Sequence, residues 1–210
     1  MGHGNFARAT ISISGKGAPA APRVYPPWWT EEERVIPVTI EWDRVLIDQP
    51  ELAAYVGGLR VFPSGFEMEF TAAVRPDGSG LRDQRLERRV NLRPRISPLQ
   101  PPAADDLAAM FRVGVQFADG RRAVADPTDF FGMLDPSAEL PLVQFPNGAG
   151  WTRGLSYANL RVHGIPEEGD VTLFYQWLEF AVGEASVVID GDALRAAAAR
   201  ATVLWEHPGG

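Results

Sequence analysis

The chain has 210 residues, a formal net charge of −7 and no cysteine, and 45% of its residues are hydrophobic. This composition predicts one globular domain with a substantial core, and it excludes a wholly disordered chain, disulfides, thiolate metal sites and a cysteine nucleophile. The negative charge disfavours general nucleic-acid binding, because it repels phosphate backbones. No apolar stretch reaches membrane-spanning length and the N-terminus has no signal-like apolar region, so we expect a cytoplasmic protein without a membrane partner.

Residues 1–30 are rich in glycine and proline. Proline fixes φ and removes backbone donors, so we interpret this segment as an extended N-terminal arm. Trp28 and Trp29 stand at its end, and the apolar area of two adjacent tryptophans predicts that they pin the arm to the domain. We place a single β-sandwich domain at residues 31–206.

Alternation of apolar and polar residues predicts strands through most of this domain. The first is expected from Val35 to Trp42, where Pro37 favours a sheet edge. Residues 59–61 and 66–74 are expected to form a strand pair or one bent strand. Further strands are expected at 111–117, 121–125, 155–162, 171–180 and 185–189, with a short one at 142–145. Asp119-Gly120 predicts a hairpin turn. The segment at 171–180 is apolar on both faces, as expected of a central strand that is covered on both sides.

The apolar spacing changes to three and four residues after Asp190, which predicts a helix over residues 192–205 with an aspartate at its N-cap. Short antiparallel strands followed by one helix are typical of an all-β fold. We therefore predict an antiparallel β-sandwich, either jelly-roll-like or Ig-like, with one C-terminal α-helix.

Signals for catalysis are weak. His163 is the best-placed histidine, but a surface histidine at a turn is the more common case, and Ser156 lies on the same expected strand rather than across a site from it. Glu67 and Glu69 share one face of an expected strand, within reach of the carboxylate pairs that glycosidases use. The same pattern is ordinary for the solvent face of a strand.

No metal or cofactor site is predicted. Asp126, Asp129 and Asp135 fall in one loop and could offer oxygen ligands to calcium, although their spacing does not match the known calcium loop. The prolines that follow two of these aspartates favour turn initiation instead.

The best binding candidates are an arginine-rich segment and three tryptophans expected in loops. The segment runs from Leu81 to Arg95, and an acidic surface or a phosphate would suit it. The alternatives are a solvated charged loop and pairing with the protein's own Glu31-Glu32-Glu33. The candidate residues are Arg82, Arg85, Arg88, Arg89, Trp28, Trp29 and Trp151.

Several short motifs together resemble uncharacterised β-sandwich proteins that are common in GC-rich bacterial genomes. These motifs are Gly57-Gly58-Leu59-Arg60-Val61, Pro63-Ser64-Gly65-Phe66, Phe117-Ala118-Asp119-Gly120-Arg121, and a closing helix that starts at Ile189-Asp190-Gly191 and ends at Leu204-Trp205. The resemblance implies a bacterial, cytoplasmic origin and no assigned activity.

Our leading hypothesis is a non-enzymatic binding or protein-interaction module with a protein partner. The alternatives are a carbohydrate-active hydrolase that uses strand carboxylates, and a structural or assembly subunit whose arm is exchanged between copies.

Overall fold

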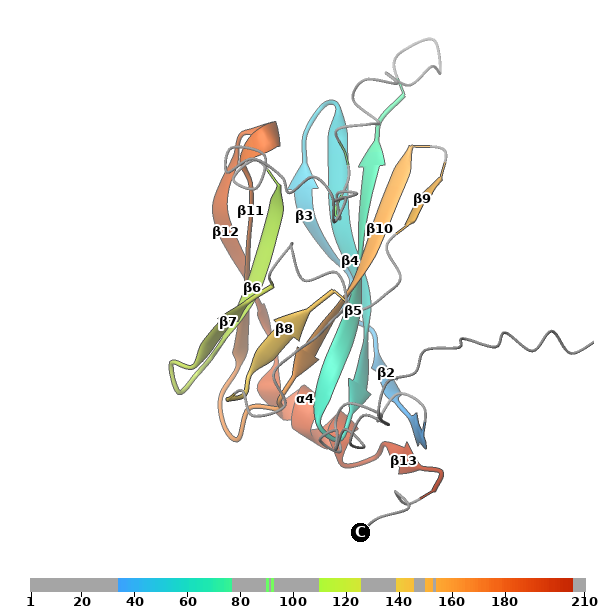
Figure 1. Cartoon of the computed structure of the whole chain (residues 1–210), viewed down its shortest axis with the longest axis vertical. Coiled ribbons are helices and arrows are strands. Elements are labelled where there is room, and N and C mark those ends of the chain that lie inside the picture. The colour runs from blue at the N-terminus through green and yellow to red at the C-terminus, as the bar shows by residue number, and fades with distance from the viewer. Residues whose placement is uncertain are drawn as a thin grey trace, which may run out of the picture.

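The structure is a computed structural model that describes residues 34–76, 90, 92, 110–125, 139–145, 150–152 and 154–205. Two antiparallel sheets face each other and enclose the core (Figure 1), which confirms the predicted all-β sandwich with one helix. The N-terminal arm predicted at residues 1–30 lies outside the described residues.

The larger sheet has seven strands, in the order β2-β4-β5-β10-β8, with β3 paired to β4 and β9 paired to β10. Its strands are β2 (Val38–Ile40), β3 (Arg44–Asp48), β4 (Leu52–Phe62), β5 (Gly65–Val74), β8 (Leu142–Gln144), β9 (Gly150–Thr152) and β10 (Leu155–His163). The expected strands at 59–61 and 66–74 are thus the central hairpin β4–β5.

A bulge in β4 keeps one face of this hairpin apolar. Val56 pairs with Phe70 and Leu59 pairs with Met68, so β4 holds one more residue than β5 between these two pairs. Gly58 takes up the extra residue with φ at 60°, a left-handed conformation that favours glycine. Both Val56 and Leu59 therefore point into the core.

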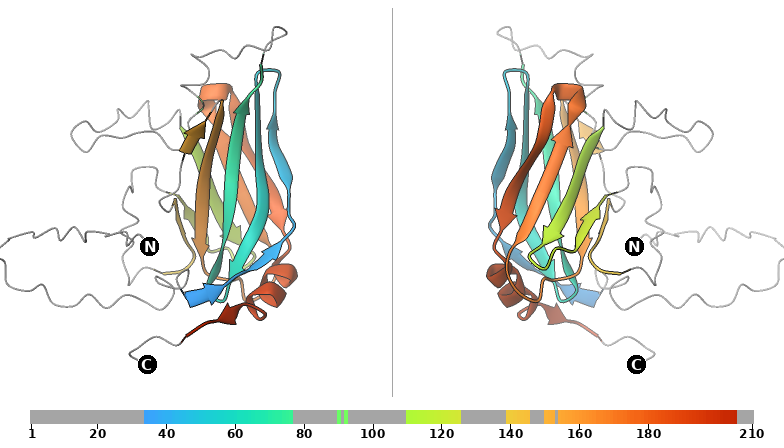
Figure 2. Two further views of the ribbon diagram at one scale, coloured as in Figure 1. Left: turned by 90° about the vertical axis from the view of Figure 1, so that its right-hand side faces the viewer. Right: turned by 90° about the vertical axis from the view of Figure 1, so that its left-hand side faces the viewer.

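The smaller sheet has four strands in the order β12-β11-β6-β7 (Figure 2). They are β6 (Phe111–Phe117), β7 (Arg122–Val124), β11 (Val171–Trp177) and β12 (Val182–Ile189). The predicted hairpin turn is confirmed between β6 and β7, where Gly120 has φ at 90°. The strand expected at 171–180 ends earlier, because a 3-10 helix (η2, Leu178–Phe180) follows Trp177.

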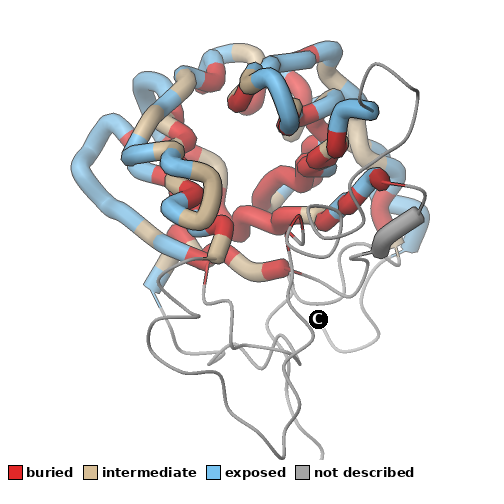
Figure 3. Tube along the Cα trace, turned by 90° about the horizontal axis from the view of Figure 1, so that it is seen from above, coloured by how far each residue is buried: buried red, intermediate tan, exposed pale blue. Residues whose placement is uncertain are grey.

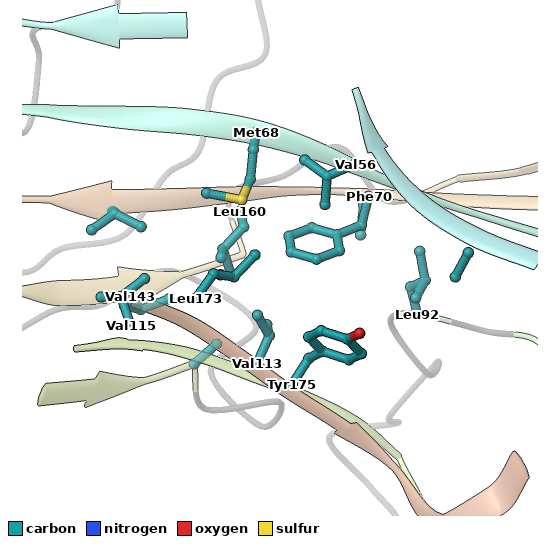
Figure 4. Packing of buried hydrophobic residues seen from close by; sticks show 14 of the residues in the cluster. Val56, Met68, Phe70, Leu92, Val113, Val115, Val143, Leu160, Leu173 and Tyr175 are labelled. Atoms are coloured by element: carbon teal, nitrogen blue, oxygen red, sulfur yellow. The ribbon is translucent and has the colours of Figure 1, made fainter. Parts of the chain in front are cut away.

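The inner faces of both sheets form one continuous core. Seen along the sandwich, buried residues alternate with exposed ones around the strands (Figure 3). Phe70, Leu160 and Met68 of the larger sheet meet Leu173 and Tyr175 of the smaller one (Figure 4). The outer face of β11 is only half buried, so the prediction that this strand is covered on both sides is wrong.

The C-terminal end differs from the predicted long helix. Helix α4 spans Gly191–Ala198, capped by the Asp190 carboxylate, which accepts from Ala193 N at 3.0 Å. The chain then forms a short strand, β13 (Thr202–Val203), which pairs with β1 (Val35–Ile36). Trp205 is 54% exposed and does not continue a buried helical face. Pro37 separates β1 from β2, so the single strand expected from Val35 is divided between two sheets.

Candidate functional site

The predicted binding residues fall mostly outside the described part of the chain. Arg82, Arg85, Arg88, Arg89, Trp28 and Trp29 lie outside the described residues, as do Asp126, Asp129 and Asp135. The expectation that Trp151 lies in a loop is wrong, because this residue is in β9, where it pairs with Ser156 of β10. Within the arginine-rich segment, Val90 and Leu92 are buried in the core, and Leu92 N donates to Ser156 Oγ at 3.2 Å. This segment therefore contributes apolar residues to the sandwich.

The two glutamates considered for glycoside hydrolysis lie in different environments. Glu69 is exposed on the outer face of β5, whereas Glu67 is buried and accepts from Arg60 Nη1 at 2.8 Å. One carboxylate oxygen of Glu67 is thus held in an ion pair, and only Glu69 faces solvent. The geometry gives no support to a pair of free catalytic carboxylates.

Glu67 belongs to a row of polar side chains across the outer face of the larger sheet. The strand register aligns Arg60 on β4, Glu67 on β5, Arg161 on β10 and Gln144 on β8. Arg161 is fully buried, and its guanidinium carbon lies 3.8 Å from the centre of the Phe62 ring. Because a buried cation is stable when a carboxylate and an aromatic face are beside it, we interpret this row as structural.

His163 is buried next to this row. Gln144 Nε2 and His163 Nε2 are 2.9 Å apart, so the histidine nitrogen is the acceptor and its proton is assigned to Nδ1. Burial, and secondarily the charge of Arg161, lowers the pKa of His163 to about 3. Ser156 points into the core with the even-numbered residues of β10, while His163 lies on the opposite face. A Ser156–His163 dyad is therefore excluded.

The feature best suited to binding is the edge of the smaller sheet that β12 forms. β12 pairs with β11 on one side and with no other described strand, and it forms one border of the sheet in Figure 2. Its pairing has a register shift between Val182, opposite Trp177, and Ala185, opposite Tyr175, and is regular from Ala185 to Ile189, opposite Val171. A regular edge strand presents unpaired N–H and C=O groups that can bond to another extended chain.

The other described sheet edges are short or irregular. β2, β7, β8 and β9 have three residues each, and β3 has five with a register shift between Val45 and Ile47. β12 has eight residues, none of which is lysine, arginine or proline. Short strands, bulges, prolines and basic residues are the devices that protect edges from pairing. From Ala185 onward β12 has none of them.

The side chains of β12 are also suited to a neighbour. Ala185 and Val187 pack against the core but remain partly exposed, and Val188 on the outer face is 56% exposed. Glu184 is the one charged residue of the strand, and its carboxylate lies 4.0 Å from Arg122 Nη2. The sequence analysis predicted this strand but not its position at an edge, since strand order depends on pairings between distant segments.

Among the described residues, no group of three or more His, Asp or Glu side chains is arranged to hold a metal ion. In the same part of the chain, no helix is long and apolar enough to cross a membrane. No protein family model matches the chain, and no curated protein or solved structure matches it either. The resemblance to uncharacterised bacterial proteins stays a prediction.

Proposed function

We propose that this protein is a non-enzymatic protein-interaction module that binds an extended segment of a partner protein along β12. The observation that supports this proposal is the contrast among sheet edges. The pairing of β12 has a register shift of its own between Val182 and Ala185, but it is regular from Ala185 to Ile189. With eight residues β12 is the longest described edge, since the others have five residues or fewer. Addition of a partner strand to such an edge is a recurring mode of peptide recognition.

Main-chain hydrogen bonds would supply affinity in this mode. Each contributes about 1 kcal/mol net, so a segment that pairs with Ala185 to Ile189 would bind moderately and reversibly. The partner's side chains would alternate between the two faces of the extended sheet. Those that point inward would lie beside Ala185 and Val187, which already pack on the core. Small apolar side chains at alternate positions are therefore the expected motif.

The two alternative functions have less support. A carbohydrate-active hydrolase would need free carboxylates, but Glu67 is bound to Arg60. Exchange of the N-terminal arm between copies concerns residues outside the described part of the chain. A bacterial, cytoplasmic setting is part of our proposal and follows from the composition and the resemblance of the sequence.

Selection of peptides from a random library tests the proposed function without knowledge of the partner. We expect enrichment of extended sequences in which small apolar residues occupy every second position. Val188→Lys should abolish their binding, because a lysine on an edge strand opposes pairing. Gln116→Lys is the matched control. Gln116 lies on the same sheet face as Val188, since both are in register with Thr172. Its strand, β6, is paired on both sides, so a lysine there should not affect the binding of a strand at β12.

Both substituted residues are exposed, so both variants should fold, and their circular dichroism spectra and unfolding midpoints would verify this. Selected peptides that bind the Val188→Lys variant as well as the unmodified protein would contradict strand addition at β12. So would a failure to select any extended peptide.

A further inference from the structure

A small pocket lies on the outer face of the four-stranded sheet. Its volume is about 330 Å³ when the solvent in its open mouth is included, so the pocket is shallow and would enclose only part of a small ligand. All four strands of the sheet contribute to it. The lining residues are Arg112, Val113, Arg122, Val124, Phe174, Tyr175, Gln176 and Glu184.

The floor of the pocket depends on Gly114. This residue pairs with Phe174 across the sheet, and a Cβ atom at Gly114 would lie 2.4 Å from Phe174 Cζ. The Phe174 ring therefore occupies the space above the glycine, an arrangement known for aromatic residues opposite a strand glycine. Arg122 covers part of this ring, with its guanidinium carbon 4.0 Å from the ring centre.

The charges around the pocket are unbalanced. Two guanidinium groups and one carboxylate, from Arg112, Arg122 and Glu184, leave one net positive charge. Arg122 is partly neutralised, because its Nη2 is 4.0 Å from Glu184 Oε2. Arg112 is exposed and forms no ion pair with a described residue. Gln176, directly opposite Arg112 in the register, adds amide donors beside this cation.

From this geometry we propose that the pocket binds a small organic acid, with its carboxylate on Arg112 and its apolar part against Phe174 and Val124. A guanidinium group suits a carboxylate because its donors form two parallel hydrogen bonds to the two oxygens. One net positive charge favours a monoanion over a doubly charged phosphate. The apolar lining favours an acid with an apolar body. This site does not depend on strand addition at β12.

Sodium benzoate is a suitable probe, and benzamide is its neutral counterpart of similar shape. Titration into the full-length, 15N-labelled protein should shift the amide resonances of Gly114, Phe174 and Gln176 saturably, with Kd of about 1 mM. Benzamide should bind at least about tenfold more weakly, because it lacks the charge that a guanidinium group recognises. Arg112→Gln should weaken benzoate binding about tenfold, as expected when a charged hydrogen bond is lost.

Arg200→Gln is the matched control, since Arg200 is exposed and follows helix α4, away from the pocket residues. Its affinity for benzoate should be unchanged. Unsaturable shifts, equal binding of benzamide, or equal affinity in the Arg112→Gln variant would overturn the proposal. N-acetylaspartate N-methylamide, which mimics an acidic side chain of a protein, is the remaining probe. Tighter binding of this probe than of benzoate would overturn the assignment to an acid with an apolar body, because it would indicate an acidic side chain of a protein as the ligand.

Discussion

Truncation of Leu173 tests the packing between the two sheets. This side chain is fully buried on central strand β11 and points toward the facing sheet, beside Leu160 (Figure 4). Leu173→Ala removes buried apolar atoms and leaves a cavity that neighbours on two hydrogen-bonded sheets cannot fill. Buried Leu→Ala substitutions of this kind cost about 3–5 kcal/mol. For a domain of this size, that cost corresponds to a fall in Tm of about 6–20 °C.

Leu178→Ala provides the same chemical change at an exposed site. Leu178 is in η2, next to the end of β11, and is 50% exposed. We expect a cost below about 1 kcal/mol for it, because half of this residue is already in water and its truncation leaves no enclosed cavity. Urea unfolding of both variants, followed by tryptophan fluorescence, would give the two free energies. A cost below about 1 kcal/mol for Leu173→Ala, or equal costs for the two variants, would refute this account of the core.

Three further predictions concern stability. Gly114→Ala should destabilise the fold by about 1–3 kcal/mol in urea unfolding, because the new Cβ would lie 2.5 Å from the Ala123 carbonyl oxygen. Gly183→Ala is the control and should be nearly neutral, because a Cβ at Gly183 would have no atom within 4 Å. Burial lowers the pKa of His163 to about 3 in the folded protein, so at pH values below 6.5 the unfolded state binds the proton more readily than the folded state does. The free energy of unfolding should therefore fall by about 2 kcal/mol from pH 7.5 to pH 5. An equal fall in the His163→Gln variant would contradict this cause. Asp190→Ala should cost about 1 kcal/mol by thermal denaturation, since it removes the N-cap of α4, and an unchanged Tm would argue against that cap.

The sequence predicted those elements whose pattern is local. Alternation of apolar and polar residues identified β5 and β6, and Asp119-Gly120 identified the hairpin turn after β6. The N-cap at Asp190 and the start of α4 were also evident from the sequence, because capping depends on neighbouring residues.

Features that depend on distant pairings were missed. Leu204 and Trp205 continue a helical spacing, yet the chain leaves the helix after Ala198, and Leu204 N bonds to Arg34 O, far away in the sequence. Arg161 gave no sign of burial, because its place in the polar row depends on which strands lie beside β10. The bulge at Gly58 could have been inferred, since Val56 and Leu59 are both apolar at an odd spacing.

The candidate site was not predictable for the same reason. The sequence predicted a strand from Ala185 to Ile189, but whether a strand is at an edge is a property of the whole sheet. The absence of lysine, arginine and proline from this strand was the available signal. This absence indicates a binding edge only when the lengths and pairings of the other sheet edges are known.

Hydrogen exchange, measured for the protein alone and with a selected peptide bound, tests the central claim most directly. In the free protein, the amides of β12 that do not bond to β11 should exchange rapidly, because they have no strand partner among the described residues. Strand addition predicts that peptide binding slows exchange at alternate amides between Ala185 and Ile189. Protection that is confined to other elements, with β12 unchanged, would contradict the proposed function.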